Sequence, residues 1–298
     1  MKAIGIKKIL VPLDFSDASL NALDYAESLS KLTGAEIILL HIIENLNVTT
    51  DPFYASIPPD PAYEEELKKI SSEALEKAAQ KISSANGNVV KTFSAVGRTH
   101  KEILSHAEKL KADIIIMGTH GVSGFREFVM GSNTFRVVSD SKFPVLSVQK
   151  KSKKTVFKNI LVPFSDHPHS REKIMYAIMI AGIYRASLNI VGIDDVGTAA
   201  HAKKITLEAK QIKAITEKHD ITCSTSVVTA PRNAKTILNH AKKVKADLIV
   251  TTGDTARQNL KEYFSGSVSQ QIVNHSPVPV LSVHSKFNPK TIELWQGI

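Results

Sequence analysis

Short apolar runs alternate with longer amphipathic stretches along the chain. The runs are rich in Ile, Val and Leu, which is typical of parallel strands that are buried on both faces. The stretches between them carry apolar residues at helical spacing, as at Leu20, Leu23 and Ala26. In the first half this pattern predicts strands over 9–13, 36–42, 89–95, 113–117 and 145–148, and helices over 18–32, 63–84, 99–110 and 132–139.

The same pattern returns in the second half of the chain, which indicates a tandem duplication. Residues 8–12, KILVP, return at 159–163 as NILVP, and residues 144–148, PVLSV, return unchanged at 279–283. The strands of the second copy are predicted over 160–164, 187–193, 222–228, 247–251 and 280–283. The offset falls from 151 residues (8 to 159) to 135 (144 to 279), so the second copy lacks residues that the first has near 45–62.

Strands that alternate with helices predict right-handed crossovers and a parallel sheet with helices on both faces. The 298 residues are enough for two domains of ordinary size. We therefore expect an α/β protein with two tandem domains, residues 1–150 and 151–298, each containing a five-stranded parallel sheet. The connection between them is expected near residues 149–157.

Composition places the chain among soluble globular proteins. Hydrophobic residues make up 43% and charged residues 22%, and no apolar run is long enough to span a membrane. The N-terminus lacks the pattern of a secretory signal. The single cysteine, Cys223, excludes an intrachain disulfide and a cysteine metal cluster. These features predict a protein of the reducing cytoplasm.

The net charge of +9 is compatible with attraction to nucleic acid or to another anionic surface. The basic residues are, however, spread along the chain. Their densest group, Lys150, Lys151, Lys153 and Lys154, has no interleaved aromatic residues of the kind that stack on single-stranded bases. A solvated linker explains this group better, so nucleic acid is not expected as a partner.

A glycine-containing loop follows the fourth strand of the first copy, at the edge of the sheet where α/β proteins bind ligands. It contains Gly118, Gly121 and Gly131 and leads into a helix. Glycines let the backbone approach a ligand, and a helix N-terminus offers unpaired N–H groups to an anion. Short donors follow at the helix start: Ser132, Asn133 and Thr134. The alternative is a structural turn in which Ser132 caps the helix.

Asp14 ends the first strand, directly after Pro12 and Leu13. A carboxylate at that position can accept hydrogen bonds from a sugar hydroxyl or a base amine. It can equally cap the following helix, a role that Ser16 or Asp17 could also fill. One acceptor and one anion cradle at neighbouring strand ends together describe a nucleotide site.

These motifs resemble those of the universal stress protein family, within the adenine-nucleotide α-hydrolase-like superfamily, over residues 7–148 and 158–283. The likeness is carried by a Gly-x2-Gly-x9-Gly-Ser pattern at Gly118, Gly121, Gly131 and Ser132, and by a first-strand Val-Pro-x-Asp at Val11, Pro12 and Asp14. The resemblance implies two Rossmann-like domains of the HUP type with strand order 3-2-1-4-5. It also implies an adenine nucleotide ligand, ATP or AMP, with or without Mg²⁺.

The resemblance further assigns roles to residues. Asp14 would contact the adenosine, and Ile42, at the end of the second strand, would line the adenine pocket. The expected cofactor-binding set is Pro12, Leu13, Asp14, Ile42, Met117, Gly118, His120, Gly121, Gly131, Ser132, Asn133 and Thr134. The fifth strands, within 143–148 and 278–283, would join the two domains as a pseudo-dimer, and a homodimer of whole chains is a further partner that the family allows.

The second copy departs from the nucleotide pattern. Ser165 stands in the place of the first-strand Asp, and the fourth strand leads to Gly253, after which the second glycine of the pattern is absent although Gly266 and Ser267 remain. Ala256 takes that position, where a Cβ obstructs a close phosphate approach, and Asp254 adds a repelling negative charge. We therefore expect the first domain to bind adenine nucleotide and the second to bind it weakly or not at all.

No catalytic or metal-binding set is indicated. The P-loop with its Lys-Ser/Thr and the nucleophile elbow are absent, so any ATP hydrolysis would be slow and would rely on loop amides with His120 or Arg126. His167 and His169 lack a third ligand, and His41 is expected to be a core or pocket-edge histidine.

The favoured interpretation is thus a cytoplasmic stress-response protein whose bound nucleotide regulates signalling or interaction. A slow ATP hydrolase and a nucleotide-free, chaperone-like interaction protein are the alternatives.

Overall fold

The computed structural model describes residues 5–44, 61–86, 89–119, 130–150, 152, 154–166, 172–253 and 267–284. Within them the first half contains β1 (Lys8–Pro12), α1 (Asp17–Thr33), β2 (Glu36–Ile43), α2 (Pro61–Asn86), β3 (Val90–Val96), α3 (Thr99–Leu110), β4 (Ile114–Gly118), α4 (Ser132–Asp140) and β5 (Val145–Val148). The second half contains β6 (Asn159–Phe164), α5 (Glu172–Tyr184), β7 (Ser187–Asp194), α6 (Ala199–Glu217), β8 (Cys223–Thr229), α7 (Ala234–Lys243), β9 (Leu248–Gly253), α9 (Val268–His275) and β10 (Val280–His284).

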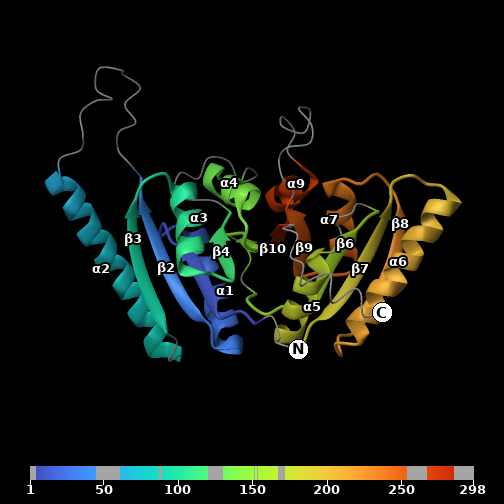
Figure 1. Cartoon of the computed structure of the whole chain (residues 1–298), viewed down its shortest axis with the longest axis horizontal. Helices are drawn as coiled ribbons and strands as arrows, with labels where there is room; N and C mark the ends of the chain where they lie inside the picture. Colours follow the sequence, from blue (N-terminus) through green and yellow to red (C-terminus); the bar gives the residue numbers. More distant parts are fainter. Residues whose placement is uncertain are drawn as a thin grey trace, which may run out of the picture.

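All of these strands belong to one sheet with the order β3-β2-β1-β4-β5-β10-β9-β6-β7-β8 (Figure 1). Each half therefore has the order 3-2-1-4-5, and the strand pairs within each half are parallel. The predicted fold class and strand order are confirmed. The predicted division at residues 150 and 151 stays a prediction. Among the described residues, no helix is long and apolar enough to cross a membrane.

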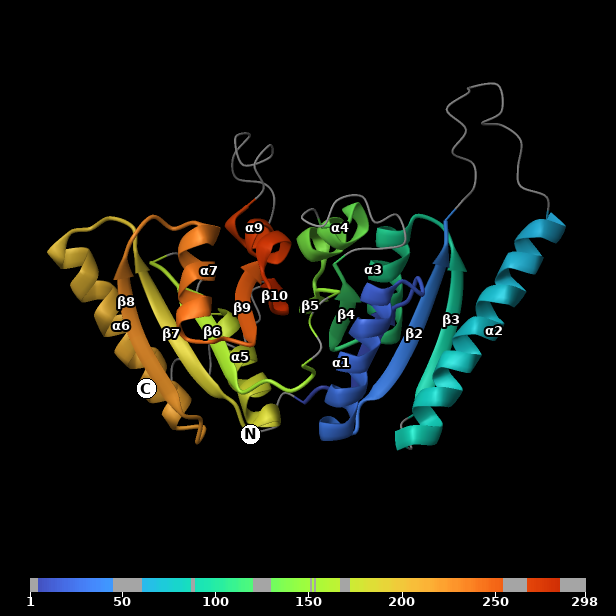
Figure 2. The same ribbon diagram turned by 180° about the vertical axis from the view of Figure 1, so that it is seen from behind.

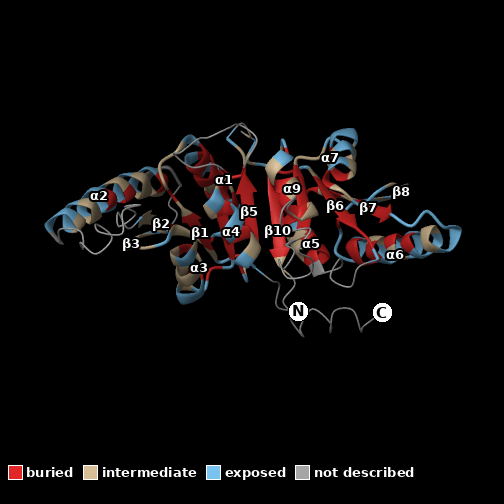
Figure 3. Cartoon of the chain, turned by 90° about the horizontal axis from the view of Figure 1, so that it is seen from above, coloured by how far each residue is buried: buried red, intermediate tan, exposed pale blue. Residues whose placement is uncertain are grey.

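Strand β1 shows why the sheet is covered on both faces. Its side chains alternate, so Ile9 and Val11 pack with α1 and α2, whereas Leu10 packs with α3 and α4 on the other face. All three are fully buried, as expected for a central parallel strand. Figure 3 shows the central strands in the colour of buried residues, with exposed residues along the outer surfaces of α2 and α6.

The two halves meet where β5 pairs with β10 in antiparallel orientation. Leu146 lies opposite Leu281, and these two residues occupy the same position of the duplicated sequence. A local pseudo-twofold axis therefore passes between them. The view from behind shows the halves as two similar layered units on either side of this seam (Figure 2).

The connection between the halves is packed against α1. Asn21 donates hydrogen bonds from Nδ2 to the carbonyl oxygens of Gln149 at 2.8 Å and Ser152 at 2.5 Å. Phe157 is buried, with its ring centroid 4.8 Å from that of Tyr184. Lys150 and Lys154 of the basic group are exposed, as a solvated linker requires. The segment is nevertheless ordered by its neighbours, because α1 holds its backbone and Phe157 enters the core.

We expect Phe157→Ala to lower the free energy of unfolding by about 3–5 kcal/mol, because it leaves a cavity between the halves. Urea denaturation followed by circular dichroism measures this loss. The matched control is Val156→Ala at the preceding position, where the side chain is 51% exposed; its effect should stay within about 0.5 kcal/mol. Equal losses in the two variants would contradict the structural role of Phe157.

Candidate functional site

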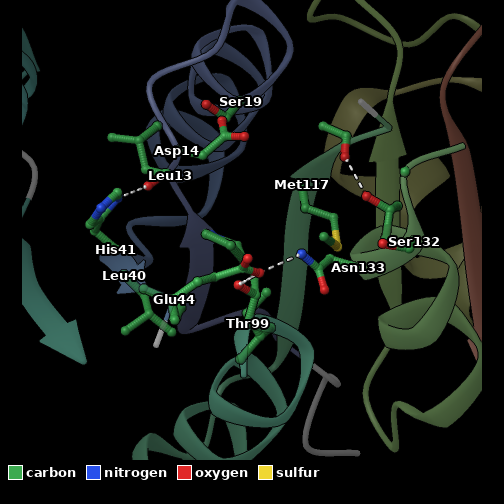
Figure 4. A pocket seen from close by; sticks show the side chains of 16 residues that line it. Leu13, Asp14, Ser19, Leu40, His41, Glu44, Thr99, Met117, Ser132 and Asn133 are labelled. Atoms are coloured by element: carbon green, nitrogen blue, oxygen red, sulfur yellow. Dashed lines mark hydrogen bonds between the residues drawn. The ribbon is translucent and has the colours of Figure 1, made fainter. Parts of the chain in front are cut away.

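A pocket of about 340 Å³ lies at the carboxyl ends of β1 and β4, where the strand order reverses (Figure 4). This volume lies within the range of small-molecule sites. Ten of the twelve residues predicted from the sequence line it: Pro12, Leu13, Asp14, Ile42, Met117, Gly118, Gly131, Ser132, Asn133 and Thr134. The other two, His120 and Gly121, lie outside the described residues.

Gly118 forms the end of β4 and is required there by the packing of α1. A Cβ atom at this position would lie 2.7 Å from the backbone carbon of Ala18. The sequence assigned the glycine to the approach of a ligand, whereas the structure gives it a role in bringing the first turn of α1 against the sheet. This close approach places the start of α1 beside the pocket.

Helix α4 begins at the pocket without a side-chain cap. Its N-cap residue is Gly131, which has no side chain to accept from the first-turn amides. The alternative in which Ser132 caps the helix is therefore wrong, because Ser132 is the first helical residue. The helix is tied to β4 by two hydrogen bonds, from the amide of Gly131 to the carbonyl of Thr119 at 2.8 Å and from the hydroxyl of Thr134 to the carbonyl of Gly118 at 2.9 Å. The positive end of the helix dipole thus faces the pocket.

Asp14 lines the pocket and also shapes the turn that follows β1. Its Oδ1 atom accepts hydrogen bonds from the amide of Ser16 at 3.0 Å and from the Ser16 hydroxyl at 2.6 Å. Ser16, and not Asp14, is the N-cap of α1 and accepts from the amide of Ser19 at 3.3 Å. Between them Phe15 has a φ of 61°, a left-handed conformation that side chains other than glycine rarely adopt. The bonds to Asp14 support this strained turn.

The pocket is also lined by six residues that the sequence did not single out as nucleotide contacts: Ser19, Leu40, His41, Glu44, Thr99 and Ile103. The Nδ1 atom of His41 donates to the carbonyl oxygen of Leu13 at 2.7 Å. The interpretation of His41 as a satisfied pocket-edge histidine is therefore confirmed. Its position at the carboxyl end of β2, next to Ile42, was the available signal.

Glu44 joins three elements at the rim of the pocket (Figure 4). Its Oε1 atom accepts from the hydroxyl of Thr99, at the start of α3, at 2.5 Å. The same atom accepts from the Nδ2 group of Asn133, at the start of α4, at 3.2 Å. A carboxylate is thereby held close to the electropositive end of α4.

Comparison of the sequence with known protein families tests the family resemblance that the motifs indicate. The model of the universal stress protein family matches residues 5–149 and again residues 157–284. The chain belongs to the universal stress protein family. The two matches confirm that it carries the family's sequence in tandem.

Single-copy universal stress proteins each match about half of this chain. Universal stress protein MJ0577 of Methanocaldococcus jannaschii is 31% identical over 160 residues, which are 50% of this chain and 99% of that protein. YxiE of Bacillus subtilis is 36% identical over 150 residues, 48% of this chain and 98% of its own length. The crystal structure of a universal stress protein from Archaeoglobus fulgidus matches over 95% of this chain and 98% of that one, with a TM-score of 0.76 and 23% identity, and shares the fold.

The second universal stress protein region differs at the position of Gly118. Gly118 pairs with Val148 on β5, and Thr252 pairs with the duplicate residue, Val283, on β10. Thr252, and not Gly253 as the spacing suggested, is therefore the counterpart of Gly118. Its hydroxyl accepts from Nζ of Lys173, a lysine that is only 5% exposed, at 3.2 Å.

Helix α9 also begins differently from its counterpart α4. Ser267 caps it and accepts from the amide of Gln270 at 3.3 Å, while the side chain of Gln270 accepts from the amide of Ser267 at 2.8 Å. This capping box satisfies amides that α4 leaves without a side-chain partner. Asp254 and Ala256, which were expected to weaken binding, lie outside the described residues.

A polar network closes over the ends of β6 and β7 in the second region. Asp194 accepts from the amide of Gly197 at 2.9 Å and from Nδ1 of His201 at 2.5 Å. The bond from the Gly197 amide, and after it the bond from His201, holds the pKa of the Asp194 carboxyl below its usual range. Lys204 contacts Asp166 at 2.6 Å on the exposed side of the same cluster.

The lowered pKa of Asp194 means that its charge stabilises the fold above the ordinary carboxyl pKa of about 4 and loses this effect as the pH falls through the folded-state value. We expect Asp194→Asn to be destabilising at neutral pH, and the difference from wild type to shrink at pH ~3. Urea denaturation at the two pH values measures it. Asp195→Asn, at the exposed neighbouring carboxylate, is the control. A difference that is the same at both pH values would argue against the role of the Asp194 charge.

Proposed function

We propose that the first half of the chain binds an adenine nucleotide, ATP or AMP, in the pocket between β1 and β4. The observation that carries this proposal is the start of α4, whose amides have no side-chain cap and open onto a pocket that also contains the Asp14 carboxylate. A helix N-terminus in this state suits phosphate. The carboxylate suits a ribose hydroxyl or a base amine.

The walls of the pocket suit an adenine ring. Leu40, Ile42 and Ile103 are among its apolar lining residues, with Met117 at the end of β4. In this arrangement the phosphates lie toward Ser132 and Asn133, and the adenosine lies toward Asp14. A Mg²⁺ ion, where ATP brings one, would travel with the phosphates.

The second half is proposed to bind adenine nucleotide weakly or not at all. Thr252 replaces the glycine at the end of the fourth strand, Ser165 replaces the Asp at the end of the first, and the capping box of α9 takes up the amides that phosphate would need. We therefore expect about one nucleotide per chain.

The biological role that fits is a stress-response protein of the cytoplasm whose nucleotide regulates a signal or an interaction. A slow ATP hydrolase is the first alternative. A nucleotide-free interaction protein is the second. A homodimer of whole chains stays a prediction.

The test begins with the nucleotide released when the purified protein is denatured, followed by titration calorimetry with ATP and AMP. We expect Asp14→Ala to weaken binding roughly tenfold or more, because a hydrogen bond to a charged group is lost. Asp14→Asn keeps an oxygen that can accept from Ser16, so the turn is retained while the charge is lost. A comparison of the two variants therefore distinguishes the effect of the charge from damage to the turn. Asp17→Ala is the control, since Asp17 pairs with Lys150 and does not line the pocket.

Two outcomes would overturn parts of this proposal. A protein that releases no nucleotide and takes up none when ATP is added would be the interaction protein of the second alternative. Two nucleotides per chain would contradict the assignment of the second half.

The charge of Glu44 leads to a separate prediction about how the affinity for a ligand depends on its phosphates. Its carboxylate lies next to the start of α4, so it repels a triphosphate more than it repels adenosine. We expect Glu44→Gln to tighten ATP binding roughly fivefold without Mg²⁺, and to leave adenosine binding unchanged. Glu108→Gln, on the exposed far end of α3, is the matched control. Equal gains for ATP and adenosine would rule out a charge effect on the phosphates.

A further inference from the structure

Helix α4 is in contact with the second half of the chain at its first turn. Met130 directly precedes the N-cap Gly131, and it is only 5% exposed. Its side chain belongs to the apolar cluster of the second half, together with Ile272 and Val273 of α9. Its amide donates a hydrogen bond to Oδ1 of Asn274, also on α9, at 3.0 Å.

The last turn of α4 is held by the second half as well. Nε2 of Gln270 donates to the hydroxyl of Ser139 at 3.0 Å. The ring of His284, at the end of β10, donates from Nε2 to the carbonyl oxygen of Val138. Figures 1 and 2 show α4 and α9 side by side above the seam from both sides. The second half therefore contacts α4 at both ends.

Among the described residues, the bond from Gln270 to Ser139 has no counterpart across the pseudo-twofold axis, because a phenylalanine stands at the equivalent position of α4. Asn274 and Ser139 occupy the same position of the duplicated sequence, and so do Gln270 and Phe135. Directly before α4, the amide of Met130 donates to the side chain of Asn274, whereas the start of α9 carries a capping box of its own residues.

We propose that the second half positions the phosphate cradle of the first, with Asn274 as the positioning residue. This inference rests on the proposed function of the pocket. The amide that Asn274 holds belongs to Met130, the residue directly before the N-cap Gly131, so its place sets the direction in which the first-turn amides of α4 point. Binding and positioning are thermodynamically coupled, so phosphate bound at α4 stabilises the contact with α9 in return.

The test is calorimetry on the full chain with ATP and with adenosine. Loss of one positioning hydrogen bond in Asn274→Ala should weaken ATP binding roughly fivefold. Adenosine binding should not change, because adenosine has no phosphate to reach α4. Asn233→Ala is the matched control: it removes the N-cap of α7 in the same half, at a comparable loss of stability, without a contact to α4.

Hydrogen exchange of the α4 amides adds a readout that needs no nucleotide. Asn274→Ala should speed exchange in α4, and Asn233→Ala should not. The inference is overturned if Asn274→Ala binds ATP like wild type, if the two variants lose ATP affinity equally, or if α4 exchanges equally in both. A wild-type protein that takes up no ATP, with α4 exchange still raised only in Asn274→Ala, would overturn the proposed function while supporting the contact that holds α4.

Discussion

The antiparallel pairing of β5 with β10 is the constraint on which the arrangement of the molecule depends. An exposed edge strand at either position would present unpaired backbone groups, and each half covers the other's edge. The pairing also brings α4 beside α9 and lets one apolar cluster run through both halves on the opposite face of the sheet. The same pairing therefore covers both strand edges and sets which helices of the two halves are neighbours.

Within this frame the two halves have diverged at equivalent positions. In the first, glycines at the end of β4 and before α4 admit α1 and leave the helix amides without a cap. In the second, a threonine held by a buried lysine and a capping box fill the same places. The chemistry that a nucleotide would need is thus replaced by internal hydrogen bonds, and the second half offers contacts to its neighbour.

Periodicity and repetition were sufficient to predict the strands. The strand order came from the family resemblance, and ten of the lining residues came from that resemblance together with the motifs at the ends of the strands. None of these signals could predict Glu44, because its bonds to Thr99 and Asn133 join segments that approach one another only in the folded chain. Counting along the loop misplaced the counterpart of Gly118, since strand register depends on pairing across the sheet. The contact of Asn274 with Met130 spans 144 residues and has no local signature.

The Leu146–Leu281 axis has a consequence for how such a protein can change. In a dimer of identical chains every substitution appears on both sides of a twofold axis at once, so a residue that supports one site must also be tolerated in the other. A single chain removes that condition. Asparagine at one side and serine at the other can then be selected independently, and the two helices beside the axis can acquire different contacts.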